Sequence, residues 1–141
     1  MVQLGRILKY GKKAIYTLVL AQMIYLWGFL MGTSSLSTLF SQKIKNQSGL
    51  ELILQRERKK LDIPDKIYIN VNWGAKSAKA RKIGENEYEI DLKKEYQNVS
   101  ILKHELYHIK DGHLDHKTSL IRYLFYEEPQ ATLYQVTGIK L

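Results

Sequence analysis

A long apolar run near the N-terminus limits the folds that this chain can adopt. Residues 14–31 read AIYTLVLAQMIYLWGFLM, a stretch without charge in which only Thr17 and Gln22 are clearly polar. A helix rises about 1.5 Å per residue and the hydrocarbon core of a bilayer is roughly 30 Å thick, so a membrane span needs about 20 residues. The run has 18 residues, and neighbouring uncharged residues can extend the span to about 20. It predicts one transmembrane helix over residues 14–32, in contact with membrane lipid, and a single-pass membrane protein.

Two other kinds of segment compete with the transmembrane anchor. A cleaved secretory signal has an apolar core of only about 7 to 15 residues, which is shorter than this run. An organelle-targeting segment is amphipathic and rich in Arg, whereas this run is apolar on all sides. The anchor is the preferred interpretation, and the other two stay open.

Charge divides the chain into two parts. The formal net charge is +8, yet no Asp or Glu precedes Glu51. The first stretch is instead basic, with Arg6, Lys9, Lys12 and Lys13. We therefore expect a basic flank (1–13), the anchor (14–32), a small polar linker that leaves the membrane as a short tether (33–47), and a soluble domain (48–141).

The soluble part predicts a small α+β domain. A Ser-x-x-Glu capping box at Ser48 starts a helix that should end before Pro64. Strands are indicated by alternating apolar residues at 67, 69 and 71 and again over residues 88–92. The basic stretch 74–86 between them predicts a loop or an irregular hairpin connection.

Three helices are expected to follow the second strand. The first runs over residues 98–110, with Asn98 or Ser100 as its cap and Gly112 as its stop. A second helical pattern covers residues 120–125, and a third follows Pro129. The expected order is helix, strand, strand, helix, helix, helix.

An H-E-x-x-H motif lies on the first of these helices, at His104-Glu105-Leu106-Tyr107-His108. A spacing of four residues places both imidazoles on one face, about one turn apart. The chain has no cysteine, so a metal must be held by His, Asp or Glu. A catalytic zinc site takes three protein ligands and leaves a position for water, and Glu105 is placed to act as the general base toward that water.

The motif has a plainer interpretation, because five residues can match by chance on a solvated helix face. Its context favours a metal site, since the helix is apolar on its other face and follows an alternating strand. A metzincin is excluded, because Asp111 and Leu114 occupy the positions of its Gly and third His. His113 and His116 lie beyond the expected helix stop and are interpreted as surface or capping residues.

The motif and a second segment resemble the gluzincins, and within them the membrane-protease branch with its minigluzincin relatives and the ImmA/IrrE-type peptidases. In these proteins a later helix carries Glu-x-x-Ala-Asp or Glu-x-x-Ala-Asn, and its Glu is the third zinc ligand. Glu128-Pro129-Gln130-Ala131-Thr132 is similar to that pattern. The resemblance covers about residues 67–134 and implies a zincin-like domain with Zn²⁺ held by His104, His108 and Glu128. Glu127 is the nearest rival for the third position.

The resemblance also has departures and further implications. Thr132 stands where the family has an acid or Asn that orients a zinc-binding His. Pro129 follows the implied ligand directly and places it near a helix start. Strand 88–92 is implied to present its edge to an extended peptide substrate. The candidates for an electrophilic helper are Tyr107, His113, His116 and Tyr134.

These patterns predict a membrane-anchored zinc endopeptidase that hydrolyses protein or peptide substrates near a membrane. The alternative is a catalytically weak or silent zincin-fold subunit with a structural or regulatory role in a membrane complex. Nucleic acid is not expected as a partner, because no aromatic platform accompanies the basic residues of the 74–86 stretch, which are Lys76, Lys79, Arg81 and Lys82.

Overall fold

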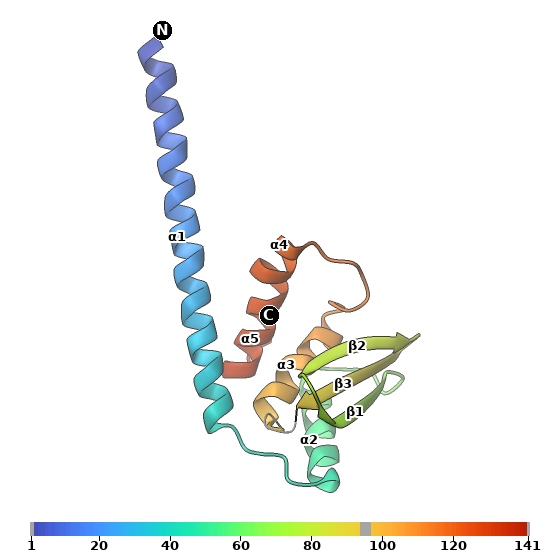
Figure 1. The fold of residues 1–141 in the computed structure, drawn as a ribbon. Helices are drawn as coiled ribbons and strands as arrows, with labels where there is room; N and C mark the ends of the chain where they lie inside the picture. The colour runs from blue at the N-terminus through green and yellow to red at the C-terminus, as the bar shows by residue number, and fades with distance from the viewer. Residues whose placement is uncertain (1, 94–96, 141) are drawn as a thin grey trace.

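A long N-terminal helix stands beside a small α+β domain in the computed structural model, which describes residues 2–93 and 97–140 (Figure 1). The elements are α1 (Val2–Phe40), α2 (Gln47–Lys60), β1 (Tyr68–Ala75), β2 (Lys79–Gly84), β3 (Glu87–Lys93), α3 (Val99–Lys110), α4 (Leu120–Arg122), the π-helical turn η2 (Tyr123–Glu127) and α5 (Glu128–Thr137). The expected α+β class is confirmed.

Helix α1 is long and apolar enough over Ala14–Phe40 to cross a membrane, and its most apolar part is exposed. A signal sequence meets the same criteria. The expectation of a short tether directly after the span is wrong, because the small polar residues continue the helix to Phe40. Their hydroxyls bond back to the helix itself: Thr33 Oγ1 donates to the Phe29 carbonyl at 3.0 Å and Ser35 Oγ to the Met31 carbonyl at 2.9 Å.

The C-terminal end of α1 packs directly on the domain. Ser37 Oγ and Ser100 Oγ lie 3.0 Å apart, and the Ser100 N–H donates to Ser41 Oγ at 2.9 Å. Beyond the helix, Ile44 is buried and its N–H donates to the Gln97 carbonyl. The segment between α1 and α2 is therefore held against the domain by side-chain and backbone hydrogen bonds.

The sheet has the order β1-β3-β2, with β1 parallel and β2 antiparallel to the central strand β3. The expectation of a loop over residues 74–86 is wrong, because β2 lies within it. Charge pairs across strands replace the apolar alternation there: Arg81 contacts Glu89, and its Nη1 lies 3.0 Å from Asp91 Oδ2. Such a strand has no period-2 hydrophobic pattern to reveal it.

The position of β3 also corrects the implied substrate-binding edge. Residues 88–92 belong to the central strand, whose backbone is paired on both sides. An added peptide strand needs a free edge. The edge strand next to the helices of the domain is β2, which contacts α3.

The caps of α2 and α3 are both asparagines. Gly49 N–H donates to Asn46 Oδ1 at 2.8 Å, so the cap of α2 is Asn46, two residues before the expected cap Ser48, and the helix ends before Pro64 as expected. Ile101 N–H donates to Asn98 Oδ1 at 2.9 Å, which confirms Asn98 as the cap of α3.

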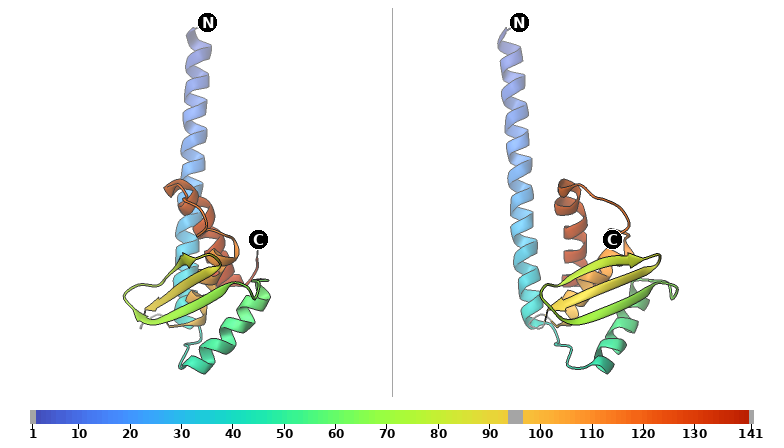
Figure 2. Two further views of the ribbon diagram at one scale, coloured as in Figure 1. Left: turned by 90° about the vertical axis from the view of Figure 1, so that its right-hand side faces the viewer. Right: turned by 45° about the vertical axis from the view of Figure 1, so that its right-hand side comes forward.

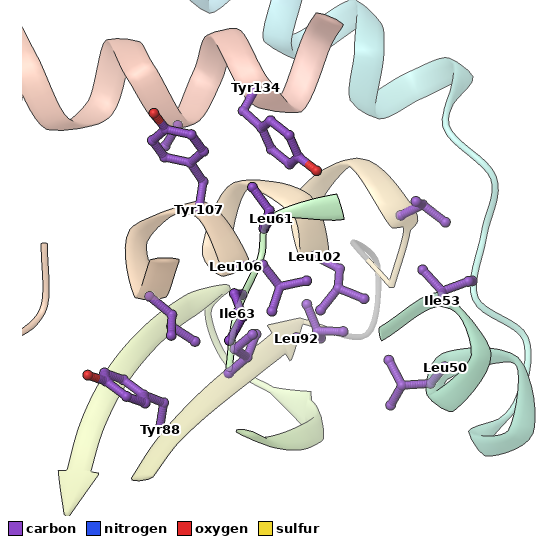
Figure 3. Packing of buried hydrophobic residues seen from close by; sticks show 14 of the residues in the cluster. Leu50, Ile53, Leu61, Ile63, Tyr88, Leu92, Leu102, Leu106, Tyr107 and Tyr134 are labelled. Atoms are coloured by element: carbon purple, nitrogen blue, oxygen red, sulfur yellow. The ribbon is translucent and has the colours of Figure 1, made fainter. Parts of the chain in front are cut away.

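The hydrophobic core lies between the sheet and the helices. Helix α3 packs against the sheet on one side and α5 on the other (Figure 2). Leu92 and Leu102 meet between the sheet and α3, while the rings of Tyr107 and Tyr134 join α3 to α5, with centroids 5.4 Å apart (Figure 3). The Tyr134 hydroxyl donates to the buried Glu57 carboxylate of α2 at 3.2 Å. This packing fixes the relation between α3 and α5, the two helices that carry the predicted site.

The C-terminal helices form one continuous run from Leu120 to Thr137 rather than two helices separated at Pro129. The Glu128 N–H donates to the Tyr123 carbonyl five residues earlier, which is the bond of a π turn. Pro129 brings no N–H to the helix. The wider π turn before Pro129 accommodates the loss of the hydrogen bond that proline cannot make, so the helix continues through Pro129.

Candidate metal centre

Three side chains converge on one point between α3 and α5. His104 Nε2 and His108 Nε2 lie 3.2 Å apart, and the Glu128 carboxylate approaches them at 3.5 and 3.2 Å. One ligand atom from each of the three residues lies within 4.8 Å of the others, so the group could hold a metal ion. Two imidazoles, one carboxylate and an open side match the donor set of a catalytic zinc site.

Local packing explains why the three side chains meet. The four-residue spacing on α3 turns both imidazoles toward α5, while Leu102 and Leu106 on the same helix are fully buried. Ala131 is also fully buried, and its small side chain lets α5 lie close to α3 one turn after Glu128. Burial disfavours the charge of Glu128, but hydrogen bonds from both histidines and from Tyr123 hold the pKa of its carboxyl well below the ordinary value.

Glu105 is buried beside the donor group. Its Oε2 accepts the Ala80 N–H of β2 at 2.6 Å. Burial raises the pKa of the Glu105 carboxyl, against the opposing effect of the neighbouring histidines. A cavity of about 340 Å³ is lined by Glu105, the three donors and the start of β2. A small molecule bound there would meet the carboxylate and the donors together.

The buried residue that contacts the outer nitrogen of His104 is Gln135, not Thr132. Gln135 Oε1 lies 3.1 Å from His104 Nδ1. The same oxygen accepts the hydroxyl of Ser34 at 3.0 Å, and Gln135 Nε2 donates to Thr38 Oγ1 at 3.1 Å. A metal-binding His is held in one orientation by such a contact. Gln135 stands seven residues after Glu128, which is two helical turns, so it shares the same helix face.

His113 lies behind His108 and is buried, contrary to the expectation of a surface or capping residue. The Nδ1 atoms of the two rings are 2.9 Å apart. Gly112 adopts a φ of 67°, which ends α3 and turns the chain back on itself. Burial, together with the neighbouring His108, lowers the pKa of His113. His113 Nε2 lies 3.1 Å from Asp111 Oδ2, although the two are not aligned for a hydrogen bond.

Glu127 and His116 lie together outside the donor group. Glu127 is buried, and its Oε1 lies 3.1 Å from Arg122 Nε and 3.4 Å from His116 Nε2. The rival third donor is therefore engaged in a separate ion-paired cluster. Glu128, the neighbouring residue, is the carboxylate that reaches the histidines.

Tyr123 is a residue at the site that sequence reasoning missed. Its ring stacks on His108 with centroids 6.4 Å apart, its hydroxyl donates to Glu128, and it lines the cavity. At about 100° per residue in an α-helix, positions five apart point in clearly different directions. The π turn widens the spacing and brings Tyr123 onto the face of Glu128. Two of the predicted helper residues, Tyr107 and Tyr134, instead lie in the core.

A second cavity of about 460 Å³ reaches the donors from the side of α1. Met31 and Ser34 of α1 line it together with Glu105, the donors His104 and Glu128, and Ala78 at the turn before β2. Ala78 lines the first cavity as well. The donor group is thus open on two sides, with the beginning of β2 alongside both.

The site therefore combines a three-residue donor group, a buried carboxylate beside it, and cavities on either side. The donors are His104, His108 and Glu128, and the carboxylate is Glu105. Comparison of the chain with protein-family models, with curated proteins and with solved structures found no match.

Proposed function

We propose that the protein is a membrane-anchored, zinc-dependent endopeptidase. The observation that carries the proposal is the convergence of His104, His108 and Glu128 beside the buried Glu105. The donor set fits zinc, and the order of these residues along the chain resembles that of the gluzincins. Helix α1 would anchor the enzyme in a membrane through its apolar stretch.

The roles of the protein groups follow from their positions. Zinc held by His104, His108 and Glu128 would supply a Lewis acid and lower the pKa of a bound water. Glu105, held by the Ala80 N–H, takes a proton from the attacking water and passes it to the leaving amine. The Tyr123 hydroxyl lies beside Glu128 at the edge of the cavity and would stabilise the negative charge that develops on the scissile carbonyl oxygen.

A peptide substrate is supported by the free edge of β2. The Ala80 N–H of the edge strand β2 bonds to Glu105, so this edge of the strand faces the site. Residues 78–80 line the first cavity. An extended peptide that adds to β2 as a strand would run past the donors, with its backbone held by main-chain hydrogen bonds.

The alternative is a silent zincin-fold subunit of a membrane complex, which is favoured by Thr132 in place of the family's acid or Asn. Metal content tests whether the three donors bind zinc, which the endopeptidase requires. The full chain in detergent should bind about one zinc, consistent with the one donor group found among the described residues. Glu128→Ala should abolish this binding, whereas Glu127→Ala should retain it, with circular dichroism confirming that both variants fold.

Hydrolysis is tested separately from metal binding. Glu105→Gln should retain zinc and fold but lose cleavage of unstructured protein substrates, because the amide cannot accept the proton. Unchanged cleavage by Glu105→Gln would exclude the proposed mechanism. Zinc-binding wild-type protein that cleaves no substrate in a broad peptide library would support the silent subunit.

A further inference from the structure

The start of the C-terminal helix carries a cluster of exposed apolar side chains. Leu120 and Ile121 are 71% and 72% exposed, and Phe125 and Tyr126 are 39% and 51% exposed. We call these four residues the apolar tip. Adjacent large apolar residues with such exposure at the end of one helix indicate a contact surface rather than scattered surface positions.

The apolar tip lies level with the apolar stretch of α1. The α4–η2–α5 helix and α1 run side by side in the same direction (Figure 1), and the Ser34–Gln135 hydrogen bond fixes their register. Fifteen residues separate Leu120 from Gln135, about 22 Å at the rise of an α-helix. The same distance back from Ser34 reaches Val19, inside the apolar stretch Ala14–Phe40.

The exposure pattern of α1 agrees with this register. Half-buried positions recur at helical spacing on one face of α1, beginning at Met23 and continuing through Trp27 and Leu30. The domain therefore covers one face of α1 from about the level of the apolar tip onward. A bilayer that contains the apolar stretch of α1 must also meet the tip.

The charges around the apolar tip match a lipid surface. Residues 117–126 contain no Asp or Glu, and their two charged residues, Lys117 and Arg122, are exposed. Arg122 Nε also lies 3.1 Å from Oε1 of the buried Glu127, which offsets part of its charge. The Arg122 guanidinium lies over the Tyr126 ring, 5.6 Å from its centroid. Tyrosines with basic neighbours are typical of the headgroup level, where anionic lipids attract the cations and the apolar side chains enter the acyl boundary.

We propose that the apolar tip inserts into the bilayer crossed by α1 and forms a second membrane contact of the domain. The proposal rests on the membrane anchor proposed above and is independent of metal or peptidase activity. Tyr123 lies next to the tip and lines the metal-site cavity, so the site opens close to the lipid surface.

Site-directed fluorescence quenching tests the proposal on the full chain, which has no cysteine of its own. Ile121→Cys carries an environment-sensitive probe in vesicles of phosphatidylcholine and phosphatidylglycerol. Leu52→Cys is the matched control, since Leu52 is 69% exposed on α2, at the end of the domain away from the N-terminal part of α1 (Figure 1). Ile24→Cys, on the exposed apolar stretch of α1, is the control for the anchor.

Lipids with spin labels at shallow and deep acyl positions serve as quenchers. We expect the probe at position 121 to be quenched several-fold more than the probe at position 52, and more by the shallow than by the deep label. Quenching at position 24 with none at position 121 would overturn the second contact and leave the anchor intact. A probe at 121 shielded from water but not quenched by lipid would overturn it in favour of a protein partner. No quenching at either 24 or 121 would refute the anchor itself.

Discussion

Replacing Gln135 tests how the donor group is held in place. Its Oε1 faces His104 Nδ1 at 3.1 Å and accepts the Ser34 hydroxyl, while its amide donates to Thr38. Gln135→Met keeps the length of the side chain and removes all of these polar contacts. Without an acceptor at Nδ1, the His104 ring loses its fixed tautomer and orientation.

The expected loss follows from the contacts that disappear. Removal of such an outer contact typically weakens metal affinity 10- to 100-fold, which is about 1.4 to 2.7 kcal/mol. Three side-chain hydrogen bonds at about 1 kcal/mol each place the loss in stability of the metal-free protein at roughly 1 to 3 kcal/mol. Zinc competition with a chelating dye measures the first quantity on the full chain in detergent, and urea unfolding of the metal-free protein measures the second.

A matched control is available on the same helix. The Gln130 Oε1 is buried and has no hydrogen-bond partner among the described residues. Gln130→Met should therefore leave zinc affinity unchanged. If Gln135→Met binds zinc as tightly as wild type and as Gln130→Met, the contact with Gln135 does not position His104, and the reasoning is refuted.

Three further outcomes are expected. Leu102→Ala should lower the free energy of unfolding by about 2 to 5 kcal/mol in denaturant titrations, because Leu102 is fully buried, whereas the exposed Leu52→Ala should change it by less than about 0.5 kcal/mol. Gly112→Ala should cost about 1 to 2 kcal/mol in the same assay, because its φ of 67° is unfavourable for a residue with a Cβ. The ammonium of Lys82 lowers the pKa of Asp115, so this carboxylate stabilises the fold above its ordinary pKa and loses that effect as the pH falls through its lower folded value. Asp115→Asn should therefore lower Tm at neutral pH, with a smaller difference at about pH 3.

The class of the fold and the pairing of two histidines on one helix face could be predicted because both depend on local periodicity. The H-E-x-x-H spacing alone aligns His104 and His108 on one helix face. Glu128 was reached by resemblance, and its distinction from Glu127 depends on the packing of α5 against α3. The sequence also offered Asn98 as one of two caps of α3 and Gly112 as its stop, since each acts within one turn.

Other features depend on contacts that no local pattern encodes. Strand β2 is stabilised by charge pairs with β3, so its sequence shows no alternation of apolar residues. Without β2, the sequence could not show that β3 is the central strand. Tyr123 reaches the site only because of the π turn before Pro129. Gln135 acquires its role from contacts with α1, a helix that was expected to be separated from the domain by a tether.

The Ser34–Gln135 contact joins residues 101 positions apart, and this has a consequence for the order of events during biosynthesis. Helix α1 leaves the ribosome first, α3 later, and α5 later still, and chains fold broadly in that order. The two imidazoles are therefore in place before the carboxylate that completes the donor group arrives. Under the proposed function, membrane insertion of α1 would precede completion of the donor group, and a nascent chain that ends before α5 would have too few donors for a catalytic zinc site.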